Sequence, residues 1–177
     1  MSRFDLFTKI ILHQGVSLKM GSLSIERVLS YLDEETFTPE GLRKLNYDIL
    51  RELKINPVRA DNFITYISRV TAKEQMDFEV SDTEALINKL ISIEGIGPWS
   101  IQTFKIFALN DKNIAWVNEK KVRLGLMLYF ELEKEPTISS SKKLFESINE
   151  NKTDFSLKMY FLYFDSINQK INKNPFT

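Results

Sequence analysis

The sequence predicts an all-α protein, and three observations lead to that expectation. Apolar residues recur at i, i+3, i+4 and i+7 along most of the chain, as in Ile25, Val28, Leu29 and Leu32, which is typical of a helix that buries one face. Residues that favour helix starts stand between the apolar segments. No stretch alternates between apolar and polar residues for long enough to indicate a strand.

The apolar stripes and the start signals together predict about eight or nine helices joined by short loops. Thr38 and Asn56 each precede a proline, which is typical of an N-cap followed by proline at the first helical position. Ser81 stands three residues before Glu84, the spacing of a capping box. The other stripes cover residues 4–11, 42–53, 63–70, 86–93 and 155–167.

Composition limits the classes of function. With 177 residues, of which 43% are hydrophobic, the chain is expected to form a single domain over residues 1–177 made of two small lobes. The absence of cysteine excludes disulfides and thiolate metal sites, and a single histidine argues against a histidine-rich one, so no metal centre is predicted. No apolar run approaches the ~20 residues needed to span a bilayer, and no signal peptide is evident, so a cytoplasmic protein without a membrane partner is expected.

The charge balance bears on nucleic-acid binding. Lysine plus arginine and aspartate plus glutamate both number 24, so the net charge is zero. Nucleic-acid binders usually carry a basic excess, because phosphate contacts dominate their affinity. Any such binding here must therefore use a local basic face, main-chain amides, or both.

The segment "SIEGIGPWSIQTF" (92–104) places two of only six glycines between two helical patterns. A helix ending at Ile93 and one starting at Pro98 both leave main-chain groups unpaired. Gly95 and Gly97 permit positive φ and keep Cβ atoms off the surface, so their N–H groups can approach a ligand closely. Together with the helix N-terminus, these amides would make an anion site that holds a phosphate. The alternative is a plain turn between two helices.

The longer segment "LISIEGIGPWSIQTF" resembles the helix–hairpin–helix of the base-excision DNA glycosylases, the HhH-GPD superfamily, and its Gly-Ile-Gly-Pro-Trp form is most similar to the 3-methyladenine DNA glycosylase II branch. Residues 4–32, 53–70 and 155–164 extend the resemblance. Glu94 stands where proline is usual. The resemblance implies a two-lobed helical core with a cleft between the lobes and the hairpin at about residues 84–108, and the family's N-terminal β-domain is absent from this sequence.

The family's catalytic aspartate lies beyond the hairpin, but the corresponding segment "NIAWVNEKKVRLGL" (113–126) contains no aspartate. Matching the apolar residue three places on, Val122, puts Glu119 at the catalytic position, and this is the alignment we prefer. Reading "WVN" as the common Val-Asp pair puts Asn118 there instead. A carboxylate would stabilise the positive charge that develops on the deoxyribose and would position water. The alternatives are that Glu119 is a solvated surface residue or that Asp111, which lies too early, substitutes for it.

The resemblance also implies a base pocket. Bifunctional relatives carry a lysine where this chain has Trp99, so a monofunctional glycosylase is expected. Trp99 is implied to lie near the flipped base, and an electron-poor alkylated purine stacks well on an indole. Tyr160 and Tyr163 are candidates for the opposite wall. Ordinary packing in the core is the alternative for each of the three.

The remaining predicted site residues would contact DNA. The hairpin residues Gly95, Ile96 and Gly97 are implied to bind the backbone. In "HQGVS", Gly15 stands where the family has a bulky wedge, and Gln14 is the neighbour that could fill the space of the flipped base. Lys120 and Lys121 are candidates for phosphate contacts, with a solvated charged surface as the alternative.

Three functions follow from these observations. The first is a monofunctional DNA glycosylase that flips and removes damaged, alkylated bases from double-stranded DNA. The second is a DNA-binding member of the same fold that has lost catalysis, because the usual aspartate is replaced. The third, supported by the neutral charge alone, is a helical interaction module without a DNA role. For the first, we expect a monomer that needs no cofactor, with a monovalent cation as a candidate bridge between hairpin and phosphate.

Overall fold

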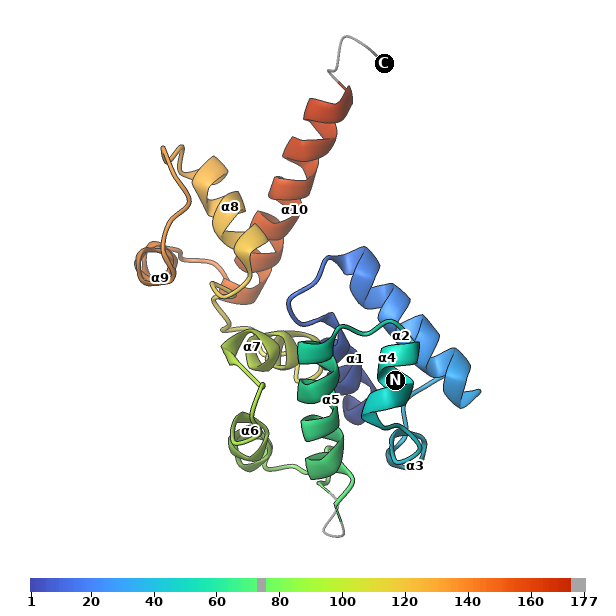
Figure 1. The fold of residues 1–177 in the computed structure, drawn as a ribbon. Coiled ribbons are helices and arrows are strands. Elements are labelled where there is room, and N and C mark those ends of the chain that lie inside the picture. Colours follow the sequence, from blue (N-terminus) through green and yellow to red (C-terminus); the bar gives the residue numbers. More distant parts are fainter. Residues whose placement is uncertain (73–75, 173–177) are drawn as a thin grey trace. The chain divides into compact units, whose positions relative to one another are not determined.

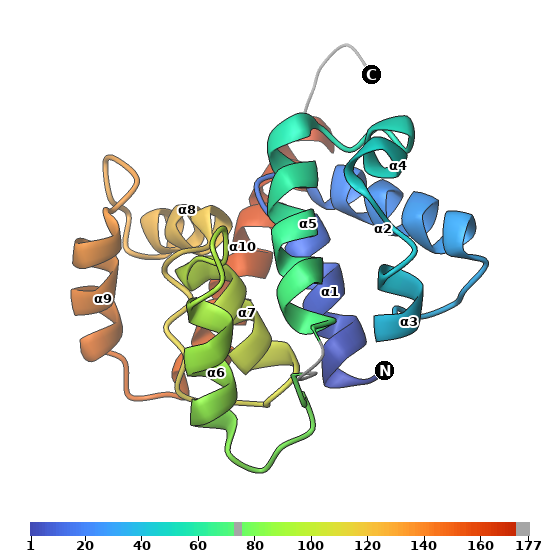
Figure 2. The same cartoon turned by 60° about the horizontal axis from the view of Figure 1, so that its bottom comes forward.

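The structure, a computed structural model, describes residues 1–72 and 76–172. Every regular element in this described part is a helix, which confirms the all-α prediction (Figures 1 and 2). In chain order the helices are α1 (Arg3–His13), α2 (Leu18–Leu32), α3 (Pro39–Leu42), α4 (Tyr47–Glu52), α5 (Pro57–Val70), α6 (Thr83–Ile91), α7 (Pro98–Phe107), α8 (Lys120–Tyr129), α9 (Ile138–Glu146) and α10 (Lys152–Asn172).

Local signals predicted most helix starts, with two corrections. Thr38 and Asn56 are N-caps, as expected. The stripe at residues 42–53 is two short helices rather than one, because the Asn46 side chain accepts a hydrogen bond from Ile49 N and starts α4 afresh. At α6 the cap is Asp82, whose carboxylate accepts from Ala85 N at 3.0 Å, so the capping box predicted from Ser81 is wrong by one residue.

The chain divides into two compact units, residues 1–104 and the residues from 105 onward, and α7 runs across the boundary. We call them unit 1 and unit 2 and describe each by itself. Unit 1 contains α1 to α6 and most of α7. Unit 2 contains α8, α9 and α10.

Aromatic side chains form the centre of unit 1. The rings of Phe7 on α1 and Phe104 on α7 meet edge to face, with centroids 5.0 Å apart. Tyr66 on α5 is fully buried, and its hydroxyl lies 2.8 Å from that of Thr8 on α1. Burial raises the pKa of the Tyr66 hydroxyl, so it stays protonated and the hydrogen bond persists at ordinary pH. These contacts pack α1 against α5 and against α7.

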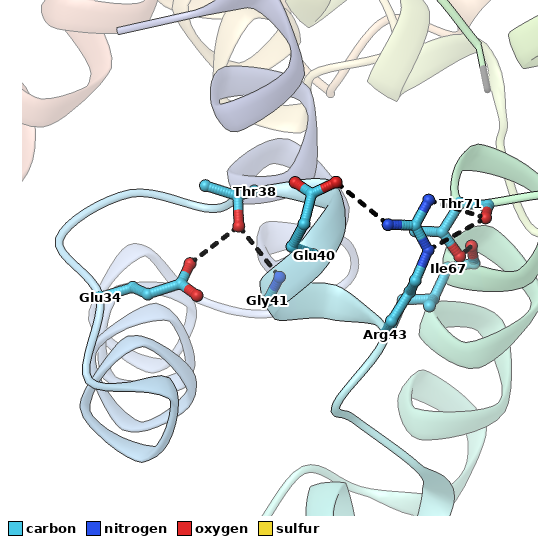
Figure 3. Close-up of polar contacts among 7 residues, drawn as sticks. All are labelled: Glu34, Thr38, Glu40, Gly41, Arg43, Ile67 and Thr71. Atoms are coloured by element: carbon cyan, nitrogen blue, oxygen red, sulfur yellow. Dashed lines mark hydrogen bonds and ion pairs between the residues drawn. The ribbon is translucent and has the colours of Figure 1, made fainter.

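A polar group fastens α3 to its neighbours in unit 1 (Figure 3). The Thr38 hydroxyl donates to the Glu34 carboxylate at 3.1 Å and accepts from Gly41 N at 3.0 Å. A Cβ on Gly41 would lie 2.5 Å from a Glu34 oxygen, so a larger residue there would displace the Glu34 carboxylate. Arg43 reaches from the end of α3 to the carbonyl of Thr71, just beyond α5. The short helix is therefore held at both of its ends.

In unit 2, α8 packs along α10 (Figures 1 and 2). Gly125 makes this contact close, because a Cβ on it would lie 2.0 Å from the main-chain oxygen of Met159. The buried side chains around it are Val122, Leu126, Phe145, Phe155 and Met159. The absence of a side chain at one position thus sets the distance between the two helices.

Two buried hydroxyls of α10 hold the loop that leads to α8, residues 108–119. Thr153 Oγ1 accepts from Ile114 N at 3.0 Å and donates to Asp111 O at 2.7 Å. Ser156 Oγ accepts from Trp116 N at 3.0 Å. Because the main chain of the loop is bonded to α10 at these points, the residues that follow it begin α8 from a fixed position.

We predict that Gly125→Ala lowers the free energy of unfolding of unit 2 by about 2 kcal/mol, because the new Cβ collides with main chain that cannot move away easily. Urea unfolding followed by tryptophan fluorescence measures it, since Trp116 is buried in unit 2. Gly97→Ala is the matched control, because a Cβ there meets nothing within 4 Å and should change stability by less than about 0.5 kcal/mol. Equal stability of the two variants would contradict the close-contact account.

Candidate functional site

The hairpin between α6 and α7, residues 92–97, is a tight turn with one left-handed residue. Gly95 has φ of 86°, whereas Gly97 does not adopt positive φ. The two glycines were expected to permit positive φ, and only Gly95 uses it. The Ile96 amide donates to Ile93 O at 3.1 Å, and its side chain is buried beneath the turn. Within residues 1–72 and 76–172, the N–H groups of Gly95 and Gly97 donate to no protein acceptor. Two main-chain donors of the hairpin are therefore available to a ligand.

The two glycines differ in what surrounds them. A Cβ on Gly95 would lie 3.0 Å from the Asn62 side chain of α5, so the turn packs tightly against that helix. A Cβ on Gly97 would point into open space. Gly97 therefore leaves an unobstructed approach to the N-terminus of α7, and nothing in unit 1 itself requires a glycine there.

Gln14 connects the loop after α1 to the hairpin. Its Nε2 donates to Gly95 O at 3.1 Å and to the buried Ser100 Oγ at 2.6 Å. That Gln14 fills the space left by a flipped base stays a prediction. Such a role would require both hydrogen bonds of Nε2 to break. Gly15, the next residue, has φ of 67° and no atom near its absent Cβ. His13 lies over Gly21 of α2, where a Cβ would collide with the imidazole.

A surface pocket of ≈ 460 Å³ lies in unit 1 beside the hairpin. Five of the residues predicted from the sequence line it together, although they come from segments about eighty residues apart. The lining residues are Ile11, Gln14, Gly15, Asn56, Val58, Arg59, Asn62, Gly95, Gly97, Trp99 and Ser100.

Arg59 is a pocket residue that the sequence analysis did not single out. Its guanidinium donates to the carbonyl of Leu12 at the end of α1 and to Ser24 Oγ of α2. Its Nε is buried and, among the described residues, has no hydrogen-bond partner. Partial burial lowers the pKa of the Arg59 guanidinium from its ordinary value. The signal in the sequence was the three-residue spacing of Arg59 and Asn62, which places both on one face of the helix after Asn56-Pro57.

Glu119 is a buried carboxylate in unit 2, with 7% of its surface exposed. It caps α8: Oε1 accepts from Lys121 N at 3.0 Å and lies 3.2 Å from Lys121 Nζ. The alternative that Glu119 is a solvated surface residue is therefore wrong. Asn118, the other candidate, is half-buried and precedes the cap. Asp111 accepts from Asn113 N in a local turn.

Tyr160 stands beside this carboxylate. Its ring stacks on Trp116 with centroids 5.6 Å apart, and Lys121 Nζ lies 5.6 Å from its centroid. Burial raises the pKa of the Tyr160 hydroxyl above its ordinary value of 10, and the charge of Glu119 raises it further. The phenol is thus a hydrogen-bond donor at neutral pH.

The other predicted residues of unit 2 have partners other than Glu119. Tyr163 is half-buried and meets Phe164 edge to face. Lys120 is 68% exposed and has Glu135 4.0 Å away. Trp99 belongs to the pocket of unit 1, so the prediction that it forms one base pocket with Tyr160 and Tyr163 stays a prediction.

Two further observations concern membrane-spanning helices and metal sites. Each helix in the described residues is too short or too polar to cross a lipid bilayer. The same residues contain no group of three or more histidine, aspartate or glutamate side chains arranged to hold a metal ion.

Comparison of the whole fold with solved structures gives a clear match. The chain superposes on a DNA-3-methyladenine glycosidase of Bacillus halodurans with a TM-score of 0.71 at 19% identity, covering 92% of this chain and 76% of that one. The chain has the fold of the 3-methyladenine DNA glycosylases. The same glycosylase fold in Schizosaccharomyces pombe, solved in complex with abasic DNA, matches with a TM-score of 0.71 at 22% identity over 91% of this chain and 79% of that one. The enzyme of Archaeoglobus fulgidus gives 0.70 at 18% identity over 90% and 57%.

Sequence comparison agrees with the 3-methyladenine glycosylase resemblance. A candidate DNA-3-methyladenine glycosylase of Bacillus subtilis is 27% identical over 145 residues, which are 76% of this chain and 50% of that protein. DNA-3-methyladenine glycosylase 1 of Schizosaccharomyces pombe is 26% identical over 140 residues, 76% of this chain and 60% of that one. The chain thus spans one half to three fifths of these glycosylases. No protein-family model matches it.

We predict that Gln14→Ala loosens the hairpin of this glycosylase fold. The variant loses two hydrogen bonds and leaves the buried Ser100 hydroxyl without that donor, so the free energy of unfolding of unit 1 should fall by about 1–2 kcal/mol. Amide hydrogen exchange at Ile96 should accelerate. Asn88→Ala, which removes an exposed amide on α6, is the control and should change neither quantity. Unaltered exchange in Gln14→Ala would show that this side chain does not hold the hairpin.

Proposed function

We propose that this chain is a DNA glycosylase of base-excision repair that removes alkylated bases from double-stranded DNA by hydrolysis. The observation that carries the proposal is the buried carboxylate of Glu119, fixed at the N-cap of α8. The names of the relatives and the helical fold support the same assignment.

Glu119 supplies the charge that the reaction needs. Breaking the bond between a base and C1′ leaves positive charge on the deoxyribose, and a nearby carboxylate lowers the energy of that state most where water is excluded. The hydrogen bond from Lys121 N fixes one oxygen of Glu119, so the carboxylate does not have to reorganise during the reaction.

The hairpin supplies the grip on DNA. The N–H groups of Gly95 and Gly97 and the N-terminus of α7 hold a backbone phosphate, and Ile96 anchors the turn from below. These donors contact no base edge, so binding is independent of sequence, as repair of scattered damage requires. Main-chain donors also explain how a chain with zero net charge can bind a polyanion. Exposed Lys120 adds a further phosphate contact.

The flipped base is held by aromatic stacking. We assign Trp99, Tyr160 and Tyr163 to stacking on the base, because an alkylated purine with positive charge is attracted to the electron-rich faces of aromatic rings. The assignment accounts for selection of alkylated over normal bases, because a neutral base gains less from the same stacking.

The partner is double-stranded DNA, bound by a monomer in the cytoplasm, and the reaction needs no cofactor. A monovalent cation at the hairpin is compatible with its main chain. The carbonyls of Ile93 and Gly95 each accept one hydrogen bond, from Ile96 N and Gln14 Nε2, and each keeps a second lone pair for a cation. Such an ion would reduce repulsion between these carbonyls and a phosphate.

Glu119→Gln tests the proposal. The amide keeps an oxygen that can cap α8 but loses the charge, so release of 3-methyladenine or 7-methylguanine from methylated DNA should fall by about 10²–10³-fold. Duplex affinity should be retained. Glu133→Gln is the control, because that carboxylate is exposed in the loop between α8 and α9.

Release of free bases measured by chromatography decides between the candidates. If the wild-type protein binds duplex DNA and releases no base, it is a DNA-binding member of the fold without catalysis. If Glu119→Gln retains full activity, the carboxylate is not the catalytic group.

A further inference from the structure

An arginine of α8 bonds to the main chain just before Glu119. Arg123 is the fourth residue of α8, and its Nη1 donates to the carbonyl oxygen of Val117 at 2.7 Å. Val117 is fully buried, so its carbonyl oxygen needs a donor from within the protein. The main-chain amide of Arg123 also donates to Glu119 O at 3.3 Å. One residue therefore holds the main chain at Glu119 and two positions before it.

The position of Arg123 in the helix explains why its side chain reaches back to Val117. Side chains of an α-helix lean toward the N-terminus and lie over the preceding turn. Arg123 follows Glu119, the N-cap, by four residues, so its long side chain extends past the start of α8 to the incoming chain. The Ser156 hydroxyl of α10 fixes the same loop at Trp116 N. The bond from Arg123 adds a fixed point one residue nearer to Glu119.

Arg123 is itself held by Glu135, in the loop between α8 and α9. Its Nε donates to Glu135 Oε1 at 2.9 Å, and its Nη2 lies 2.8 Å from the same oxygen. The guanidinium thus uses one edge for the glutamate and Nη1 for the Val117 carbonyl, an arrangement that the single ammonium group of lysine cannot copy. Glu135 stands two residues before Thr137, the N-cap of α9. The ion pair therefore joins the start of α9 to the start of α8.

The Glu135 partner also keeps the local charge balanced. A lone guanidinium bonded two residues before Glu119 would oppose the field of that carboxylate and weaken its attraction for positive charge on a sugar. Because Glu135 carries the opposite charge 2.8 Å away, Arg123 and Glu135 together are neutral. Their side chains are only 15% and 30% exposed, so water screens the pair incompletely. Arg123 can therefore hold the chain without diminishing the charge of Glu119.

We propose that Arg123, held by Glu135, is a positioning residue for base release, which fixes the main chain that carries Glu119 and so orients its carboxylate. The proposal rests on the proposed function, because the orientation of Glu119 matters only if its carboxylate is the catalytic group. Arg123 acts through Glu119 and not on the DNA. A displacement of the carboxylate by ~1 Å is enough to lower a rate by about 100-fold.

The test is a double-mutant cycle measured by single-turnover release of 3-methyladenine from methylated duplex DNA at saturating protein. Arg123→Lys keeps the charge but cannot bond Val117 O and Glu135 together, so the rate should fall by about 10–100-fold, with duplex affinity changed less than about 2-fold. In the Glu119→Gln background the same substitution should change the remaining rate by less than about 2-fold, because no charge is left to misplace. A purely structural role would lower the rate equally in both backgrounds.

Arg43→Lys is the matched control. Arg43 also bonds to one main-chain carbonyl, that of Thr71, and to one glutamate, Glu40, but it does so in unit 1. The rate of base release should be unchanged in this variant. If Arg123→Lys fails to fold, Glu135→Gln takes its place in the cycle. It removes the charge that holds Arg123, so the rate should fall several-fold in the wild-type background and not in Glu119→Gln.

Amide hydrogen exchange gives a second readout, which does not depend on activity. The amide of Lys121 donates to Glu119 Oε1, so it should exchange faster in Arg123→Lys and not in Arg43→Lys. Unchanged exchange at Lys121, an unchanged rate, or an equal loss of rate in both backgrounds would overturn the proposal. Failure of the glycosylase proposal would appear separately, as absence of base release by the wild-type protein. Positioning in catalysis would then be excluded as well, and faster exchange at Lys121 would show only that Arg123 orients the cap.

Discussion

The interaction on which unit 1 depends is the pair of hydrogen bonds from the Gln14 side chain to the hairpin. One amide group, by donating to Gly95 O and Ser100 Oγ, joins segments 81 and 86 residues apart. The pocket beside the hairpin is lined by residues from both segments and from α5, so its shape follows from this connection. Two residues of α5 support the same arrangement. Asn62 packs against Gly95, and Arg59 donates a hydrogen bond to the end of α1.

In unit 2, contacts with main-chain atoms fix the position of the candidate site residue. Thr153 and Ser156 hold the loop before α8, and the contact of Gly125 with Met159 O holds α8 itself. Glu119 stands where the held loop meets the held helix. A charged side chain in that position keeps a fixed orientation. Electrostatic catalysis requires such a fixed orientation of a carboxylate. Burial without a partner would be costly, and the Lys121 ion pair and the cap hydrogen bond offset that cost.

Features that depend on neighbours in the chain could be predicted from the sequence, and features that depend on distant contacts could not. The caps at Thr38 and Asn56 are local and were predicted correctly, whereas adjacent Ser81 and Asp82 are both good caps and the wrong one was chosen. The glycines of the hairpin stood out because few others exist. Burial of Glu119 could not be predicted, because "NEKKVR" has the composition of an exposed surface and the residues that bury its loop lie about forty positions later. Arg59 was missed because its hydrogen-bond partners, Ser24 and Leu12, lie 35 and 47 residues earlier in the chain.

The central claim is that main-chain donors of the hairpin bind a phosphate of DNA. The most direct measurement is a titration of ¹⁵N-labelled protein with a duplex that contains an abasic-site analogue, followed through the amide resonances. The account predicts that the amides of Gly95 and Gly97 shift more than those of any other loop in unit 1, and that added salt reverses the shifts. If the duplex binds and these two amides do not move, the hairpin is only a turn between helices and the account is wrong.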